Sequence, residues 1–388
     1  MNPSQTFTFP ALPTEIVLGF GVSNTLADHI WKLKGTRALI VADEGVDAAG
    51  ILSKVTAGLG RANIPYAVFT DVPQDSSTTA IYTAVQDLKH NNSDIVVGIG
   101  GGSALDTAKA VAIAATNEEP ITRLVGLDKV KTAPLPVIAL PTTSGTGSEV
   151  SFWSVITDDE THTKVSVGGA AVFPKVALCD PELTMTLPPH LTASTGMDAL
   201  THAIESYVNN ATQPISQTLA LRAIELIGKH LRTATLNGRD RESRYGMMLG
   251  STLAGIAMNP TRLGISHALA MPLGSWEHKI PHGIANAIVL PHVMEYNLPA
   301  NIPRYIDVAQ ALGENVQGLT ARDAAQRSVG AVRQLSADLP IPSGLSAFGL
   351  KEAAIPRIVE EAMKSGNIAV NPRLTKADDL TEICRRAL

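Results

Sequence analysis

The sequence predicts an α/β domain followed by an all-helical domain. From about residue 36 to residue 180, short β-rich runs alternate with amphipathic stretches, whereas helical periodicity dominates after that point. A strand–helix–strand order is what a parallel sheet with crossover helices requires. We therefore predict an α/β domain over residues 1–187 and a helical domain over residues 188–388, with the boundary beside Pro188 and Pro189.

The predicted elements follow from the pattern in each half. Strands are expected at residues 37–43, 66–72, 94–103 and 136–143, with helices at 80–90 and 105–116. In the second half, helices are expected at residues 192–208, 214–231 and 244–258. An alternation of apolar and polar residues from Thr6 to Phe9 predicts one further strand near the start of the chain.

Composition restricts the class of protein. The 388 residues carry a net charge of −5, and Lys and Arg are scattered among Asp and Glu, so we expect no nucleic-acid partner. The first residues lack the features of a signal peptide, and the uncharged stretch at 245–261 is short of a bilayer crossing. The two cysteines, Cys179 and Cys384, make neither a disulfide framework nor a cysteine metal site. A cytoplasmic protein without membrane contacts is expected.

A glycine-rich turn lies between a predicted strand and a predicted helix. In "DIVVGIGGGSALDTAKA", the residues Gly100–Ser103 place backbone amides and a helix N-terminus where an anion can approach, which would suit a pyrophosphate. The spacing differs from the usual fingerprint G-x-G-x-x-G, and tight strand-to-helix turns also use glycine for steric reasons alone.

Two further features lie at predicted strand ends. The loop "PTTSGTGSEVS", residues 141–151, is rich in hydroxyl groups and follows an apolar strand, the position where an open α/β sheet binds its ligand. Asp43 ends the strand "RALIVAD", where a carboxylate can accept hydrogen bonds from a ribose diol and repel a 2′-phosphate. With a dinucleotide bound, Asp43 would favour NAD over NADP.

The helical half contains a candidate metal site. Asp198 and His202 are four residues apart in a helical segment, so their side chains share one face, although such a pair is often only a hydrogen bond or a cap. His267 and His282 lie in stretches poor in charge, where a lone imidazole would have few partners. Three imidazoles and a carboxylate suit Fe²⁺ or Zn²⁺ better than Ca²⁺ or Mg²⁺, and such an ion can act as a Lewis acid beside a nicotinamide ring.

The chain resembles the group III, or iron-containing, alcohol dehydrogenases along essentially its whole length. The motifs that carry the resemblance, in chain order, are "GIGGGSALDTAKA", "PTTSGTGSEVS", "DPELT", "GMDALTHAIESYV", "GISHALA", "PHGIANAIVLPHVMEYN" and "NPRLTKADDL". The resemblance implies an NAD-binding α/β domain, a helical metal-binding domain, and reversible hydride transfer between NAD(H) and a small alcohol or aldehyde. It also implies a homodimer.

The resemblance also assigns roles to individual residues. The implied metal ligands are Asp198, His202, His267 and His282, the same set that the residue pattern proposes. The implied cofactor-binding residues are Asp43, Gly101, Gly102, Ser103, Asp106, Thr142, Thr143, Thr146 and Lys164. Asp106 belongs to the glycine motif, where its role is either to hold the loop or to contact the cofactor.

The sequence also departs from the family pattern. Relatives usually carry a second histidine four residues after the first in an "H-A-x-x-H" helix, and here that position is Met271. An additional histidine, His278, lies four residues before His282, and we hypothesise that it replaces the missing one as a catalytic residue. A solvent-facing side chain between Glu277 and Lys279 is the alternative. The loop "VPQDSSTTA" stands where many relatives have Asn-Pro-Thr near the adenosine.

Other functions stay open at this point. A reductase of a small oxo-acid such as maleylacetate would need a cation near the pocket, and Arg262 is the only basic residue close to these histidines in sequence. A polyol dehydrogenase is a second alternative. A lyase similar to dehydroquinate synthase would need several Lys and Arg for a phosphate-bearing substrate. A non-catalytic, metal-stabilised binding protein is the last alternative.

We predict that Asp43→Gly admits NADP, because the substitution removes the carboxylate that would repel the 2′-phosphate. The measurement is the ratio of kcat/KM for NAD to that for NADP. A ratio unchanged by the substitution would show that Asp43 is not the selector.

Overall fold

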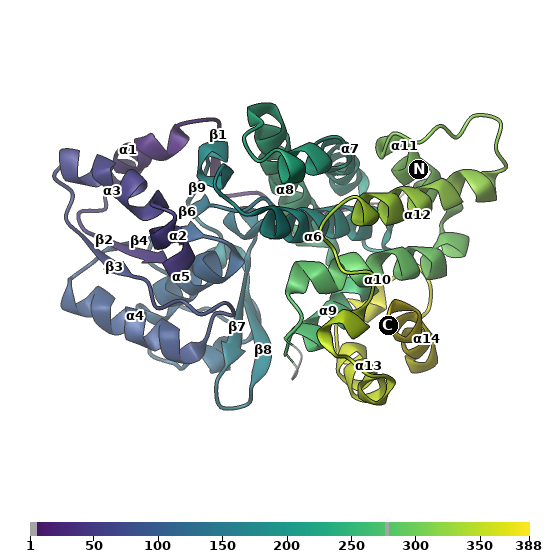
Figure 1. Ribbon diagram of the computed structural model, residues 1–388. Helices are drawn as coiled ribbons and strands as arrows, with labels where there is room; N and C mark the ends of the chain where they lie inside the picture. Colours follow the sequence, from purple (N-terminus) through teal and green to yellow (C-terminus); the bar gives the residue numbers. More distant parts are fainter. Residues whose placement is uncertain (1–5, 276–278) are drawn as a thin grey trace. The chain divides into compact units, whose positions relative to one another are not determined.

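The chain divides into two compact units. The computed structural model describes residues 6–275 and 279–388 (Figure 1). The first unit comprises Pro13–Pro188 and Asn237–Met248, and the second comprises Pro189–Leu236, Leu249–Leu388 and the segment before Pro13. The sequence-based boundary between residues 187 and 188 stays a prediction. The inclusion of residues 237–248 in the first unit had no signal in the sequence pattern.

Side-chain contacts explain why residues 237–248 belong to the first unit. The Arg241 guanidinium lies 3.7 Å from the centre of the Phe20 ring, and Tyr245 stacks on the same ring at 6.5 Å. Arg241 also pairs with Glu182 at 3.1 Å. These contacts are long-range in sequence, so helical periodicity alone could not predict them.

The first unit is built on a parallel sheet. Its strands are β1 (Glu15–Leu18), β2 (Ala38–Ala42), β3 (Tyr66–Phe69), β4 (Ile95–Gly100), β6 (Val137–Pro141) and β9 (Val176–Cys179). Its helices are α1 (Leu26–Lys32), α2 (Glu44–Ala48), α3 (Ile51–Arg61), α4 (Thr78–His90) and α5 (Gly102–Ala114). A smaller sheet contains β5 (Gly126–Leu127) and the antiparallel pair β7 (Trp153–Asp158) and β8 (Thr163–Gly168).

The strand order creates a ligand-binding position. The order across the large sheet is β1-β9-β6-β4-β2-β3, and every neighbouring pair is parallel. From β2 the chain moves outward to β3 and then returns to the other side of β2 as β4. The order therefore reverses between β2 and β4, and the crevice at the carboxyl ends of such strands is where open α/β sheets bind ligands.

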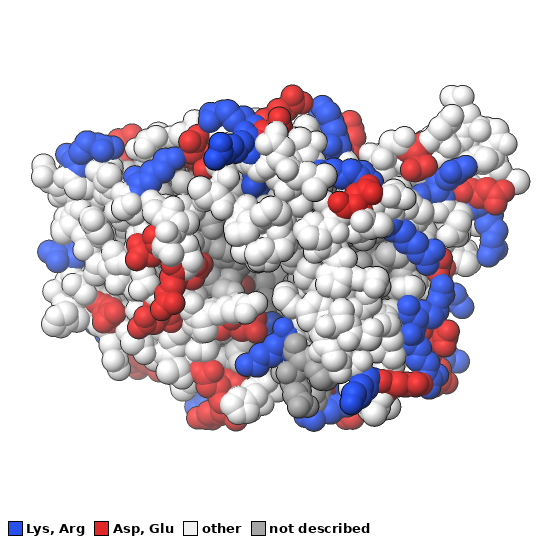
Figure 2. Space-filling view, viewed as in Figure 1, with Lys and Arg blue, Asp and Glu red and all other residues white. Residues whose placement is uncertain are grey.

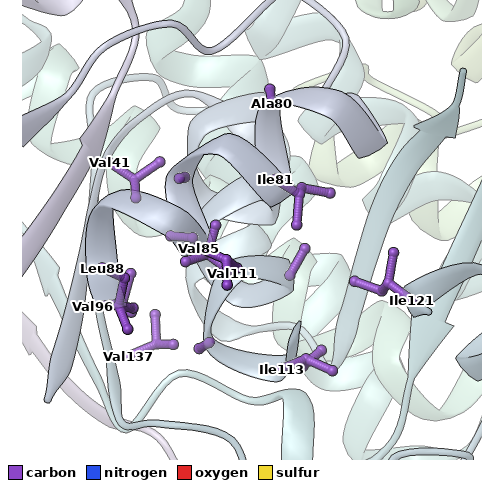
Figure 3. Close-up of a cluster of buried hydrophobic side chains, with 14 of the residues drawn as sticks. Val41, Ala80, Ile81, Val85, Leu88, Val96, Val111, Ile113, Ile121 and Val137 are labelled. Carbon is purple, nitrogen blue, oxygen red and sulfur yellow. The ribbon is translucent and has the colours of Figure 1, made fainter. Parts of the chain in front are cut away.

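Both faces of this sheet are covered by helices, as the continuous apolar strands require. In β2, Leu39 and Val41 point into a core shared with α4 and α5, whereas Ile40 points into a core shared with α1 and α3. Figure 3 shows the first of these cores, in which Ile81 and Val85 of α4 pack towards the sheet. The period of two along β2 therefore separates the two helical layers.

The predicted strand at Thr6–Phe9 is wrong, because these residues form no regular element. The first strand instead is β1, which begins at Glu15 and pairs with β9 from Glu15 through Leu18. Alternation is only a local signal, and a strand also needs a partner. The partner of β1 is more than 150 residues away, with Leu18 opposite Cys179.

The second unit is helical, as predicted. Its helices are α6 (Pro189–Val208), α7 (Pro214–Leu236), α9 (Ile265–Ser275), α10 (His282–Asn297), α11 (Ile302–Ala311), α12 (Ala321–Ala337), α13 (Ile355–Met363) and α14 (Ala377–Ala387). Helix α8 (Arg241–Thr261) contributes its later turns. One core joins α9, α10, α13 and α14 around residues such as Leu269, Val289 and Ile358, each at most 1% exposed. In the part of the chain that the structure describes, the helices are too short or too polar to span a bilayer.

Candidate functional site

The carboxyl ends of β2 and β4 bring Asp43 beside the glycine-rich turn. Asp43 caps α2, because its Oδ1 accepts a hydrogen bond from the Val46 amide at 2.9 Å. Gly100 has a φ of +155°, and a Cβ there would lie 2.6 Å from the Ala104 Cβ and 3.0 Å from Asp43 Oδ2. Glycine is therefore required at this position for both backbone conformation and space. A carboxylate thus lies at the point where the strand order reverses.

The hydroxyl-rich loop after β6 packs directly on the glycine turn. The Thr142 amide donates to the Gly100 carbonyl at 3.0 Å. A Cβ on Gly102 would lie 2.7 Å from Thr146 Cγ2, and a Cβ on Gly101 would lie 3.5 Å from Thr143 Cγ2. The structure therefore places these predicted cofactor-binding residues together, at the start of α5, where the first-turn amides have no partner within the helix.

Two other predicted cofactor residues contact the loop that precedes α4. The Ser103 hydroxyl donates to the Gln74 carbonyl, and Lys164 on β8 pairs with Asp75 at 2.7 Å. A hollow of about 270 Å³ opens beside this loop, at the end of β3, and is lined partly by Asp71 and Ser77. Ser103 and Lys164 thus lie against the segment that departs from the family pattern.

Asp106 holds the hydroxyl-rich loop. Its Oδ1 accepts from the Ser148 hydroxyl at 2.5 Å, and its Oδ2 accepts from the Val155 amide at 3.0 Å. Lys109, 1% exposed, lies 3.4 Å from Asp106 Oδ1 and donates to the Trp153 carbonyl at 2.7 Å. Burial lowers the pKa of Lys109, and the charge of Asp106 opposes that shift. These contacts favour the first of the two roles that the sequence left open for Asp106. Lys109 was not predicted at all, because two of its partners, Ser151 and Trp153, are more than 40 residues away in sequence.

The predicted metal ligands come from three helices of the second unit. Asp198 and His202 lie on α6, His267 near the start of α9, and His282 at the first position of α10. Asp198, His202 and His267 are 3–5% exposed, whereas the His282 side chain is 32% exposed. One end of the cluster is therefore reachable from outside the helical unit's core.

The structure brings three of these four side chains to one point. One ligand atom each from Asp198, His267 and His282 lies within 4.8 Å of the others. Asp198 Oδ1 is 3.6 Å from His267 Nε2 and 3.7 Å from His282 Nε2. The His202 ring instead stacks on the His267 ring, with centroids 4.5 Å apart. His202 therefore lies beside the convergent group, in ring contact with one of its members.

Glu205 is a functional candidate that the sequence analysis missed. It is 3% exposed, and its carboxylate accepts from the amides of Gly264 at 2.8 Å and Ser266 at 2.7 Å. It also contacts His267 Nδ1 at 2.7 Å. This contact places the proton on Nδ1 and leaves Nε2 for an ion, the usual support of a metal-binding histidine. The missed signal is the spacing of Asp198, His202 and Glu205, which share one helix face at i, i+4 and i+7.

The cluster has the chemistry of a cation site. Burial raises the pKa of Asp198, but the neighbouring His202, His282 and His267 outweigh burial and hold it well below its usual value. Burial disfavours a charged His267, yet hydrogen bonds to Asp198 and Glu205 raise its pKa to about 9. A positive charge is thus favoured between these side chains. A divalent ion that binds there would displace the proton that otherwise gives His267 its positive charge. The donor set fits Fe²⁺ or Zn²⁺.

Met271 occupies the position at which relatives have the second histidine. Met271 lies half-buried one turn after His267 on α9. Its thioether is only a weak acceptor and cannot relay a proton. His278 lies outside the described residues, so its catalytic role stays a prediction.

The comparisons with known proteins agree along the chain. A model described as "Iron-containing alcohol dehydrogenase" matches residues 13–181, and one described as "Fe-containing alcohol dehydrogenase family, C-terminal" matches residues 192–388. The 1,3-propanediol dehydrogenase of Klebsiella pneumoniae is 37% identical, over 97% of both chains. The NAD-dependent methanol dehydrogenase of Bacillus methanolicus is 36% identical, over 97% of this chain and 99% of that one.

Solved structures give the same result. The crystal structure of a 1,3-propanediol oxidoreductase superimposes with a TM-score of 0.96 at 37% identity, covering 98% of this chain and 100% of that chain. Such agreement over both halves confirms the predicted fold class.

We predict that Glu205→Gln weakens zinc binding by about 10- to 100-fold, the usual effect of losing the group that orients a ligating histidine. The amide can no longer accept three N–H groups, and His267 loses the contact that fixes its tautomer. Zinc affinity would be measured by competition with a coloured chelator. Glu225→Gln, at an exposed position on α7, serves as the control and should bind zinc normally. Equal affinities in the two variants would remove Glu205 from the site.

Proposed function

Because the chain belongs to the iron-containing alcohol dehydrogenase family, we propose that it transfers hydride reversibly between NAD(H) and a small primary alcohol or aldehyde. The observation that carries this proposal is the convergence of Asp198, His267 and His282 in the helical unit of a chain whose other unit has a dinucleotide-type strand reversal. Membership of an oxidoreductase family decides against the lyase and the non-catalytic binding protein.

The first unit is proposed to bind NAD at the strand reversal. Gly101, Gly102 and Ser103 would present helix N-terminal amides to the pyrophosphate. Thr142, Thr143 and Thr146 would contact phosphate and nicotinamide ribose, and Lys164 the ribose. Asp43 would accept hydrogen bonds from the adenosine ribose and select NAD. The adenine ring would bind at the end of β3, and the hollow beside Asp71 and Ser77 supports this position.

The second unit is proposed to hold Fe²⁺, with Zn²⁺ as the alternative, through Asp198, His202, His267 and His282. When bound, the ion supplies Lewis acidity at the substrate oxygen. Glu205 keeps His267 Nε2 available, and His202 packs against the His267 ring to limit its rotation. Burial of Asp198, His202 and His267 strengthens the charge interactions among them.

The proton taken from the alcohol needs a route that avoids Met271. We propose that His278 supplies it, on the basis of the paired loss and gain of histidine in the sequence. Imidazole is suited to this role because its unperturbed pKa lies near neutrality.

The substrate is proposed to be uncharged. Arg262, five residues before His267, has its guanidinium against Gly366, where a Cβ would lie 2.3 Å from Nη1. Engagement of this side chain with the turn after α13 favours an alcohol or aldehyde over an oxo-acid.

Assembly and location are further proposals. A homodimer is supported by β1, an edge strand of the large sheet whose outer side pairs with no strand among the described residues. A cytoplasmic location is supported by Cys179 and Cys384, which are buried free thiols. Independence from nucleic acid is supported by the net charge of −5 and by the face in Figure 2, where Lys and Arg are interspersed with Asp and Glu.

The test combines metal analysis with turnover. The protein, reconstituted separately with Fe²⁺ and Zn²⁺, should oxidise or reduce members of a panel of primary alcohols and aldehydes with NAD(H). Asp198→Ala should lose both the ion and turnover, because the remaining imidazoles lack the anionic ligand. Asp378→Ala, at an exposed position on α14, is the matched control and should keep both. Absence of NAD(H)-dependent turnover on every compound would refute the proposal.

A further inference from the structure

One amide side chain contacts all three of the convergent ligand atoms. Asn286 lies on α10, one turn after His282, and is fully buried. Its Nδ2 donates to Asp198 Oδ1 at 2.8 Å. The same nitrogen is 3.1 Å from His267 Nε2 and 3.3 Å from His282 Nε2. A single NH₂ group therefore links side chains from α6, α9 and α10.

The orientation of this amide is fixed by its contact with Asp198. Turning the amide over would place its oxygen 2.8 Å from Asp198 Oδ1, so that two acceptor oxygens would face each other. The present orientation leaves Asn286 Oδ1 buried and without a hydrogen-bond partner among the described residues. An unpaired buried carbonyl is destabilising. The fold therefore tolerates an unpaired carbonyl oxygen on Asn286, while the NH₂ group of the same side chain faces the three ligand atoms.

We propose that Asn286 is a positioning residue of the metal site. In the metal-free protein its NH₂ group keeps Asp198, His267 and His282 at one point, and a divalent cation that binds there takes over the Nε2 lone pairs of the two histidines while the hydrogen bond to Asp198 remains. The proposal rests on the function proposed above. A group beyond the ligands typically orients the ligating side chain that it contacts. Asn286 acts on three, and two of them, Asp198 and His267, come from other helices. Its loss should therefore loosen the whole donor set.

The chain offers a matched control on the same helix. Asn297 is also buried on α10, at 2% exposed, but its amide pairs reciprocally with Asn371 at 2.9 and 2.7 Å. Asn297→Leu removes a buried amide of equal size without touching the ligands. It separates a general cost of losing a buried asparagine from a specific effect on the metal site.

The test measures zinc affinity and thermal unfolding of full-length protein. Wild type, Asn286→Leu, Asn286→Asp, Asn297→Leu and Asp198→Ala are treated with a chelator, then titrated with Zn²⁺ against a coloured chelator. Asn286→Leu should bind Zn²⁺ about 10-fold more weakly or worse. Asn297→Leu should lower the Tm while leaving the affinity at the wild-type value. Wild-type affinity in Asn286→Leu would overturn the proposal.

Asn286→Asp keeps the proposal testable if the leucine variant does not fold. A second carboxylate would face Asp198 at close range, so the metal-depleted variant should have a lower Tm than wild type. Added Zn²⁺ should then raise its Tm by more than it raises that of wild type, because the cation relieves the repulsion. A zinc-dependent rise equal to that of wild type would contradict the placement of Asn286 at the site. If Asp198→Ala binds Zn²⁺ as tightly as wild type, the proposed ligand set itself fails, whatever the Asn286 variants do.

Discussion

Burial of the Asp198 carboxylate is the constraint on which the helical unit depends. An ionised carboxylate that is 3% exposed is several kcal/mol less stable than in water unless positive charge and hydrogen bonds compensate it. The compensation comes from imidazoles on α6, α9 and α10 and from the amide of Asn286. These three helices are therefore joined through one charged group. A divalent ion bound there would add further positive charge beside the Asp198 carboxylate.

Glu205 extends the same constraint. It is a second buried carboxylate on α6, and it accepts two backbone amides at the start of α9 as well as contacting His267. Gly264 is part of this arrangement, because a Cβ there would lie 2.6 Å from Glu205 Oε1. The start of α9 is thereby fixed to α6, and His267 is placed by the backbone as well as by its own side chain.

The first unit has a different constraint: a ligand must be able to reach the carboxyl ends of its central strands, β2 and β4. The reversal of strand order puts Asp43 next to Gly100, and the absence of a side chain at Gly102 admits Thr146. The Asp106 and Lys109 side chains hold the hydroxyl-rich loop against α5 through Ser148 and the Trp153 carbonyl. Buried polar contacts therefore position the loop, while its hydroxyls stay near the helix N-terminus.

The features predicted correctly from the sequence are those that depend on local patterns. The continuous apolar runs gave the central strands, and the i,i+4 pair gave Asp198 and His202 on one helix face. The sequence did not predict Lys109 or Asn286, because each acts through partners far away in sequence, Lys109 through Trp153 and Asn286 through Asp198. Glu205 shares a helix face with Asp198 and His202, but its role depends on His267 of α9, which that spacing alone does not reveal. The prediction of a strand at Thr6–Phe9 was wrong for a related reason, because alternation of apolar and polar residues does not reveal whether a pairing strand exists.

X-ray absorption at the metal edge of the zinc-loaded protein would show whether three imidazoles and one carboxylate hold the ion. We expect a shell of nitrogen and oxygen at about 2.0–2.2 Å, with the outer scattering of three imidazoles falling to two in His202→Ala. That variant is informative because His202 stacks beside the convergent group. A shell of oxygen alone, or a spectrum unchanged in His202→Ala, would refute this ligand set.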